Sequence, residues 1–133
     1  MNVGIDIDAT ITETPEFFAL LTRALREAGH RVYVVSYRDK ADIDKSRAEV
    51  DEHGITYDDL FHPEDGEDIP GFKARMAREL ELDVFFDDMP EAFIEMPPGV
   101  KRFWLCDPEV YNLKRMIDAL GPGMLKFGGG EEG

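Results

Sequence analysis

Acidic side chains follow two short apolar runs of this chain, at the places where buried strands would end. Asp6 and Asp8 follow the run that begins at Val3, and Asp87 and Asp88 directly follow a Val-Phe-Phe run. One such acid is commonly a turn former or a helix cap. Asp6, however, has an isoleucine on either side, and a carboxylate in an apolar strand is costly unless something binds it. Crowded carboxylates repel one another unless a cation lies between them, so the pattern predicts a divalent-metal site.

Hydroxyl groups stand at comparable positions. Thr10 lies two residues after Asp8, and Ser36 follows the β-branched run at 32–35. An all-oxygen donor set suits Mg²⁺ better than zinc. The single cysteine, Cys106, has no partner for a disulfide or a zinc site. The histidines are in no metal-ligand spacing; they are His30, His53 and His62.

The order of apolar runs and helical segments predicts the elements that must bring these residues together. Strands are expected at residues 2–7, 32–35, 57–61, 84–86 and 101–106. Helices are expected at residues 15–28, 40–53, 72–81 and 108–119, with one helical turn at 90–95 and a polar loop at 62–71. This alternation predicts an α/β fold: a Rossmann-like, three-layer, open parallel sheet of about five strands with helices on both faces. Ligands of such sheets bind beyond the carboxyl ends of the strands, where the acids stand.

Composition limits the partners and the compartment. The 133 residues carry 29 acidic and 15 basic side chains, a net charge of -14. This balance argues against nucleic-acid and anionic-membrane partners, which require clustered basic residues. The start of the chain lacks a signal peptide and no apolar run is long enough to span a bilayer, so we expect a cytoplasmic protein. One core domain is expected at 1–120, followed by a flexible glycine-rich tail at 121–133.

Four motifs, in order, resemble those of the haloacid dehalogenase-like (HAD) superfamily. Residues 3–12 resemble its first motif, Asp-x-Asp-x-Thr after an apolar strand, and Ser36 resembles the hydroxyl that ends its second motif. Lys73, fourteen residues before Asp87, is placed like the third-motif lysine. Asp87 and Asp88 resemble the acidic pair of the fourth motif. Each motif alone is weak, but four in the right order are specific.

The resemblance implies a phosphatase that acts through an aspartyl-phosphate intermediate. Asp6 would be the nucleophile, and Asp8 would protonate the leaving oxygen and then activate water. The carboxylate-crowded site is expected to keep Asp8 partly protonated near neutral pH. Ser36 would donate a hydrogen bond to the phosphoryl group, and Lys73 would balance its charge. An aspartate at position 8 also favours phosphate-ester hydrolysis over dehalogenation.

The resemblance implies a Mg²⁺ ion held by Asp6, by the backbone carbonyl of Asp8 and by Asp87, with Asp88 bound directly or through water. One residue departs from the pattern. Ala9 stands where phosphatase members usually have glycine, which matters if the backbone there needs a positive φ.

The intervals between the motifs are too short for the cap domain that most members of the superfamily carry. The resemblance therefore implies an open site, which a neighbouring subunit of a homo-oligomer could cover. A small phosphomonoester, such as a nucleotide or a sugar phosphate, is the expected substrate. Thr10, Ser36, Tyr37 and Arg38 are expected to face it, although Tyr37 could simply pack and Arg38 could simply be solvated. His62 and the acidic loop after it could rim the site, but an ordinary surface loop is the preferred interpretation.

Two alternatives stay open. A non-catalytic HAD-like module would bind phosphate or a partner without turnover, but such a module is expected to have lost some of these acids. A phospho-accepting receiver domain has a similar size and acidity. It would need an aspartate after the third strand and a lysine after the fifth, and neither stands in an evident place here.

Overall fold

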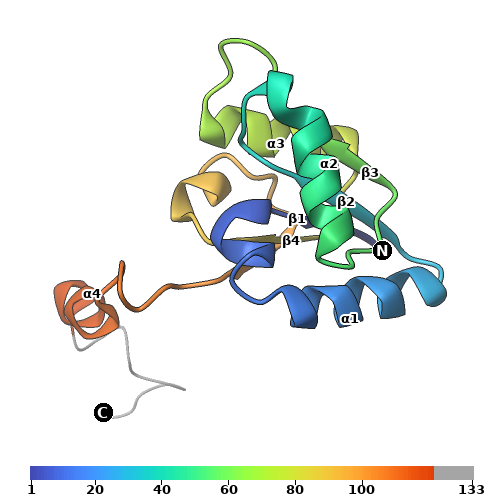
Figure 1. The fold of residues 1–133 in the computed structure, drawn as a ribbon. Helices are drawn as coiled ribbons and strands as arrows, with labels where there is room; N and C mark the ends of the chain where they lie inside the picture. The colour runs from blue at the N-terminus through green and yellow to red at the C-terminus, as the bar shows by residue number, and fades with distance from the viewer. Residues whose placement is uncertain (122–133) are drawn as a thin grey trace.

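The computed structural model describes residues 1–121 as an open five-stranded sheet with helices against both faces (Figure 1). The strands are β1 (Asn2–Ile5), β2 (Arg31–Val35), β3 (Asp59–Phe61), β4 (Val84–Asp87) and β5 (Lys101–Trp104). The helices are α1 (Pro15–Glu27), α2 (Ile43–Glu52), α3 (Ile69–Glu79) and α4 (Leu113–Leu120), with short helical turns η1 (Ile7–Ile11), η2 (Lys40–Asp42) and η3 (Pro90–Phe93). The expected three-layer α/β fold is confirmed, and the described residues contain no inserted cap domain.

All five strands run parallel in the order β3-β2-β1-β4-β5. The chain moves from β1 to β2 and β3 on one side, then crosses back to place β4 on the other side of β1. The carboxyl ends of β1 and β4 therefore form the switch point of the sheet, where open α/β sheets hold their ligands.

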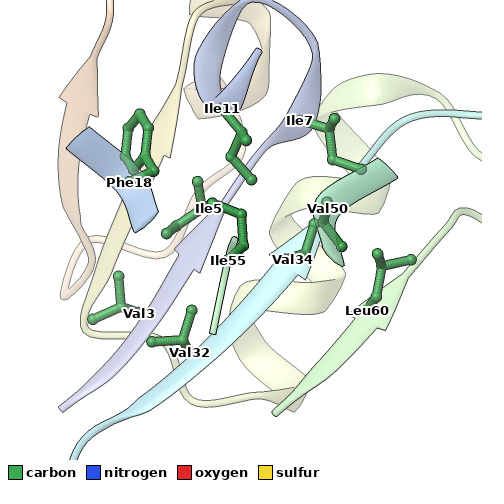
Figure 2. Packing of buried hydrophobic residues seen from close by; sticks show 10 residues of the cluster. All are labelled: Val3, Ile5, Ile7, Ile11, Phe18, Val32, Val34, Val50, Ile55 and Leu60. Carbon is green, nitrogen blue, oxygen red and sulfur yellow. The ribbon is translucent and has the colours of Figure 1, made fainter. Parts of the chain in front are cut away.

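One core lies between the sheet and the helices α1 and α2. Figure 2 shows its side chains converging from β1, β2 and β3, from η1 and from both helices. Alternate residues of each strand point to this face, so Val32 and Val34 of β2 are fully buried here. Helix α1 begins with Pro15 in its first turn and is followed by Gly29 at a φ of 90°, as expected for a helix that must stop there.

The second core lies on the opposite face, under α3 and η3. Phe72 and Met76 of α3 pack there against Phe85 of β4. Gly4 of β1 faces this layer, and a Cβ at Gly4 would stand 2.7 Å from the Cδ1 atom of Leu82. The Leu82 side chain, in the turn after α3, thus packs so closely on β1 that a Cβ at position 4 would make it shift.

Several element boundaries differ from those expected. Strand β1 ends at Ile5 because the chain turns into η1 after Asp6, and β5 ends at Trp104. Helix α3 begins at Ile69, three residues earlier than expected, because the Asp68 side chain accepts a hydrogen bond from the Gly71 amide and caps it.

The last helix begins at Leu113 rather than at 108. The carbonyl of Asp107 accepts hydrogen bonds from Val110 and Tyr111, which makes a turn there, and Asn112 then caps α4. Helix α4 stands away from the sheet in Figure 1. Cys106 is half-buried. No helix within residues 1–121 is long and apolar enough to cross a membrane. Beyond Gly121, the expected glycine-rich tail lies outside the described residues.

Candidate metal and phosphoryl site

Three carboxylates meet at the switch point. Asp6 follows β1, Asp87 ends β4, and Asp88 is the next residue. Each offers a carboxylate oxygen within 4.8 Å of the others. The backbone amide of Asp6 donates to the Phe86 carbonyl, so the pairing of β1 with β4 places the acids side by side. Asp6 and Asp87 are 6% and 1% exposed, a burial that carboxylates accept only with compensating charge.

Lys73 supplies part of that charge. Its Nζ donates to Asp6 Oδ1 at 2.9 Å, to Asp87 Oδ2 at 2.8 Å and to the Val35 carbonyl at 2.9 Å. All three donors of the ammonium are thus used, and the side chain is 2% exposed. Helix α3 carries Lys73 on its buried face, with the Nζ atom 5.1 Å from the centre of the Phe85 ring.

The remaining charge suits a divalent cation. When ionised, the three carboxylates carry three negative charges. Lys73 contributes one positive charge, so two negative charges stay uncompensated. An all-oxygen cluster with this deficit, two of its acids buried and Asp88 half-buried, could hold a divalent metal ion.

The titration of the acids reflects the same imbalance. Burial raises the pKa of Asp6 to about 7; Lys73 opposes this rise, and Asp87 adds to it. Burial and the neighbouring Asp87 also raise the pKa of Asp88. Burial alone would lower the pKa of Lys73, but its two carboxylate partners outweigh that effect and raise it. The lysine therefore stays charged, while Asp6 holds a proton easily unless another cation is present.

The loop after β1 has an unusual backbone. Ala9 lies in the left-handed region, with φ 56° and ψ 11°, inside the helical turn η1. The Ala9 amide donates to Thr12 Oγ1 at 2.9 Å. Glycine adopts this conformation without the steric cost that Cβ imposes, so the alanine introduces strain at the position where the resemblance led us to expect glycine.

Asp8 does not join the carboxylate cluster. Its side chain is 64% exposed, and its two oxygens accept hydrogen bonds from Nη2 and Nε of Arg38 at 2.8 and 2.9 Å. The hydrogen bonds from Arg38 lower the pKa of Asp8, so the expectation that carboxylate crowding keeps this residue protonated is wrong. The physical reason is that Asp8 faces an arginine rather than the other acids.

Two hydroxyls near the strand ends are buried without a partner. Ser36 follows β2 and Thr10 lies in η1; both are fully buried, and neither side-chain oxygen has a hydrogen-bonding partner. Buried hydroxyls are seldom left in this state. Each hydroxyl is therefore available to a ligand or water that reaches it, but neither Ser36 nor Thr10 lines the pocket described next.

A small pocket of about 100 Å³ opens over the carboxylates. Its polar wall includes Asp8 as well as the cluster and Lys73, and Tyr37, Ile69 and Met89 form its apolar wall. Tyr37 is 41% exposed, and its hydroxyl donates to the Glu67 carbonyl at 2.6 Å. The Tyr37 side chain is thus held beside the pocket.

Sequence reasoning missed the residues that hold Arg38. Glu49 Oε1 lies 2.7 Å from Nη2, and Ser46 Oγ lies 2.9 Å from Nη1. His62, expected in a surface loop, is in fact 7% exposed and hydrogen-bonds to Ser46. No spacing pattern reveals this set, because its members come from the ends of β2 and β3 and from α2.

Comparison with known proteins supports the fold alone. No family model matches the chain, and no curated protein matches it. Among solved structures, a chain in the structure of the Pnkp1/Rnl/Hen1 RNA repair complex is similar, with a TM-score of 0.63 and 16% sequence identity. The similarity covers 79% of this chain but only 42% of that one, so this protein spans less than half the length of its structural neighbour.

Proposed function

We propose that this protein is a Mg²⁺-dependent phosphomonoester hydrolase of the HAD type that forms an aspartyl-phosphate intermediate on Asp6. The observation that carries the proposal is the group of buried Asp6 and Asp87, both paired with Lys73, and half-buried Asp88, at the switch point of the sheet. A buried nucleophile candidate, a fixed lysine and a cluster able to hold a cation lie on one pocket.

Asp6, Asp87 and Asp88 would hold the Mg²⁺ ion, since hard cations prefer carboxylate oxygens. When bound, the ion would neutralise the acids and let an anionic nucleophile approach an anionic phosphate. The backbone carbonyl of Asp8, expected as a further ligand, belongs to the strained turn that carries Ala9.

Asp6 would attack the phosphorus atom with one carboxylate oxygen as the bond to the leaving oxygen breaks. Lys73 already holds Asp6 Oδ1, which orients the carboxylate. The buried Ser36 hydroxyl, free of any partner, would donate to a phosphoryl oxygen and stabilise the charge that develops there. Water would then attack the aspartyl-phosphate and release inorganic phosphate.

Asp8 would protonate the leaving oxygen and later take a proton from the attacking water. It must first become less tightly bound to Arg38, because their ion pair favours the ionised carboxylate. An incoming phosphate offers Arg38 a competing anion with the same bidentate geometry. We propose that Arg38 turns part of its hydrogen bonding to the substrate, which raises the pKa of Asp8 at that step.

A non-catalytic phosphate-binding module is the second candidate. The ion pair between Asp8 and Arg38 favours it, because an acid held in this way is unsuited to donate a proton. Such a module would bind phosphate with the metal and release it unchanged. The receiver alternative fits less well, because receiver domains order their strands 2-1-3-4-5 and this sheet has the order 3-2-1-4-5.

The small open pocket and the net charge of -14 favour a small phosphomonoester, such as a nucleotide or a sugar phosphate. The structural neighbour comes from an RNA repair complex, so RNA is the competing substrate class that the experiment should include. We also propose that a second copy of the chain can cover the pocket as a lid.

The experiment compares phosphate release by wild type, Asp6→Asn and Asp44→Asn, with Mg²⁺ and with EDTA. The panel contains p-nitrophenyl phosphate, nucleoside monophosphates, sugar phosphates and an RNA oligonucleotide with a terminal phosphate. We expect turnover that needs Mg²⁺, is lost in Asp6→Asn and is kept in Asp44→Asn, which removes the same charge from the exposed surface of α2. Phosphate binding without turnover on every substrate would favour the non-catalytic module.

A further inference from the structure

A buried polar network continues from Arg38 through Ser46 to His62. Ser46 Oγ of α2 contacts Arg38 Nη1 at 2.9 Å and His62 Nε2 at 2.9 Å. On the other side of its ring, His62 Nδ1 lies 2.8 Å from the Asp39 carbonyl. Ser46 is fully buried and His62 is 7% exposed, so the network is shielded from water.

The donor and acceptor capacities of the partners define one arrangement of hydrogens that satisfies every contact in this network. The carbonyl of Asp39 can only accept, so His62 Nδ1 carries a hydrogen and donates it. Arginine can only donate, so Ser46 Oγ accepts from Arg38. The hydroxyl hydrogen of Ser46 then finds its acceptor in His62 Nε2. The tautomer of His62 that donates from Nδ1 and accepts at Nε2 therefore satisfies all three side chains at once.

This arrangement fixes the guanidinium of Arg38. Its N–H groups are engaged with Asp8 through two bonds and with Glu49 and Ser46 through one contact each. A hollow of about 550 Å³ lies beside it and offers competing carboxylates from Asp42 and Glu52. Without its contact to Ser46, the long side chain of Arg38 could turn toward those acids. The contact with Ser46 therefore matters most when the hydrogen bonds from Arg38 to Asp8 are loosened.

We propose that His62 is a positioning residue of the phosphoryl site, which acts through Ser46 to keep Arg38 beside Asp8 and the pocket. The role in turnover rests on the proposed function, whereas the effect on Arg38 does not. His62 touches no substrate in this scheme. It orients the Ser46 hydroxyl, which leaves a lone pair of that oxygen directed to the guanidinium.

Two substitutions of His62 separate this role from simple filling of space. The amide oxygen of His62→Gln can replace Nε2 as the acceptor for Ser46, whereas the amide of the shorter His62→Asn can replace only Nδ1. We expect His62→Gln to keep a kcat/KM close to wild type and His62→Asn to lose about tenfold. Ser46→Ala should lower kcat/KM by a similar factor. Combining it with His62→Asn should cause no further loss, because both changes break the same path of hydrogen bonds from His62 through Ser46 to Arg38.

A second readout needs no activity. In ¹⁵N-edited NMR spectra, the Arg38 Nε–H signal should be protected from exchange with water in wild type and in His62→Gln, and should exchange faster in His62→Asn and Ser46→Ala. An unprotected signal in wild type, or equal protection in all four proteins, would overturn the proposal. Equal losses of kcat/KM in the two His62 variants, or additive losses in the double variant, would overturn it as well. If wild type hydrolyses no substrate, the proposed function fails and the NMR measurement alone decides the role of His62.

Discussion

Replacing Asp6 by asparagine should stabilise the metal-free protein, although it removes the proposed nucleophile. Burial raises the pKa of Asp6 from 3.8 to about 7, so the folded protein disfavours the ionised carboxylate. The unfolded chain ionises this group from about pH 4 upward. As the pH rises from about 4 to 7, ionisation of Asp6 therefore lowers the free energy of unfolding. Above that range Asp6 lowers it no further.

The size of the effect follows from the same shift. A rise from 3.8 to about 7 corresponds to roughly 4 kcal/mol between the two protonation states. The substituted asparagine resembles the protonated acid, and its amide oxygen can still accept the hydrogen bond from Lys73. The variant should therefore match wild type near pH 4 and exceed its free energy of unfolding by up to roughly 4 kcal/mol at pH 8.

The assay is urea denaturation in EDTA at pH 4, 6 and 8, followed by circular dichroism. Asp44→Asn controls for the change in net charge, and its effect should stay below about 1 kcal/mol at each pH. Added Mg²⁺ should stabilise wild type far more than Asp6→Asn. The reasoning is refuted if Asp6→Asn is less stable than wild type at pH 8 in EDTA, or if its advantage does not change with pH.

Three further substitutions test single features of the site and of the sheet by the same denaturation in EDTA. Ala9→Gly should raise the free energy of unfolding by about 1 kcal/mol, because it relieves the positive φ; a loss of stability would contradict the strain assigned there. Gly4→Ala should lower it by about 1–3 kcal/mol, because the new Cβ would stand 2.7 Å from Leu82 Cδ1; a neutral result would mean that Leu82 moves aside freely. Ser36→Ala should change it by less than about 1 kcal/mol, because the hydroxyl has no partner to lose, yet it should slow phosphomonoester turnover roughly 100-fold. Turnover equal to wild type would remove Ser36 from the mechanism.

The sheet and its acidic edge were predictable from the sequence because they depend on local pattern. Apolar runs such as 32–35, separated by helical segments, indicate parallel strands, and the carboxyl ends of parallel strands lie on one edge. Asp6 and Asp87 were therefore expected to meet. The boundaries of the elements were less predictable, because single side chains decide them, as Asp68 does at the start of α3.

The partners of each side chain were decided only by the tertiary structure. Asp8 stands two residues from Asp6, yet it faces Arg38, thirty residues away, because the chain leaves β1 and enters η1 between the two acids. His62 reaches Ser46 only because the end of β3 lies against α2. Pattern in the sequence determines which face or edge a residue occupies, but the charge and hydrogen bonding that set its pKa come from residues distant along the chain. The chemistry available to the acids was therefore settled by packing rather than by their spacing.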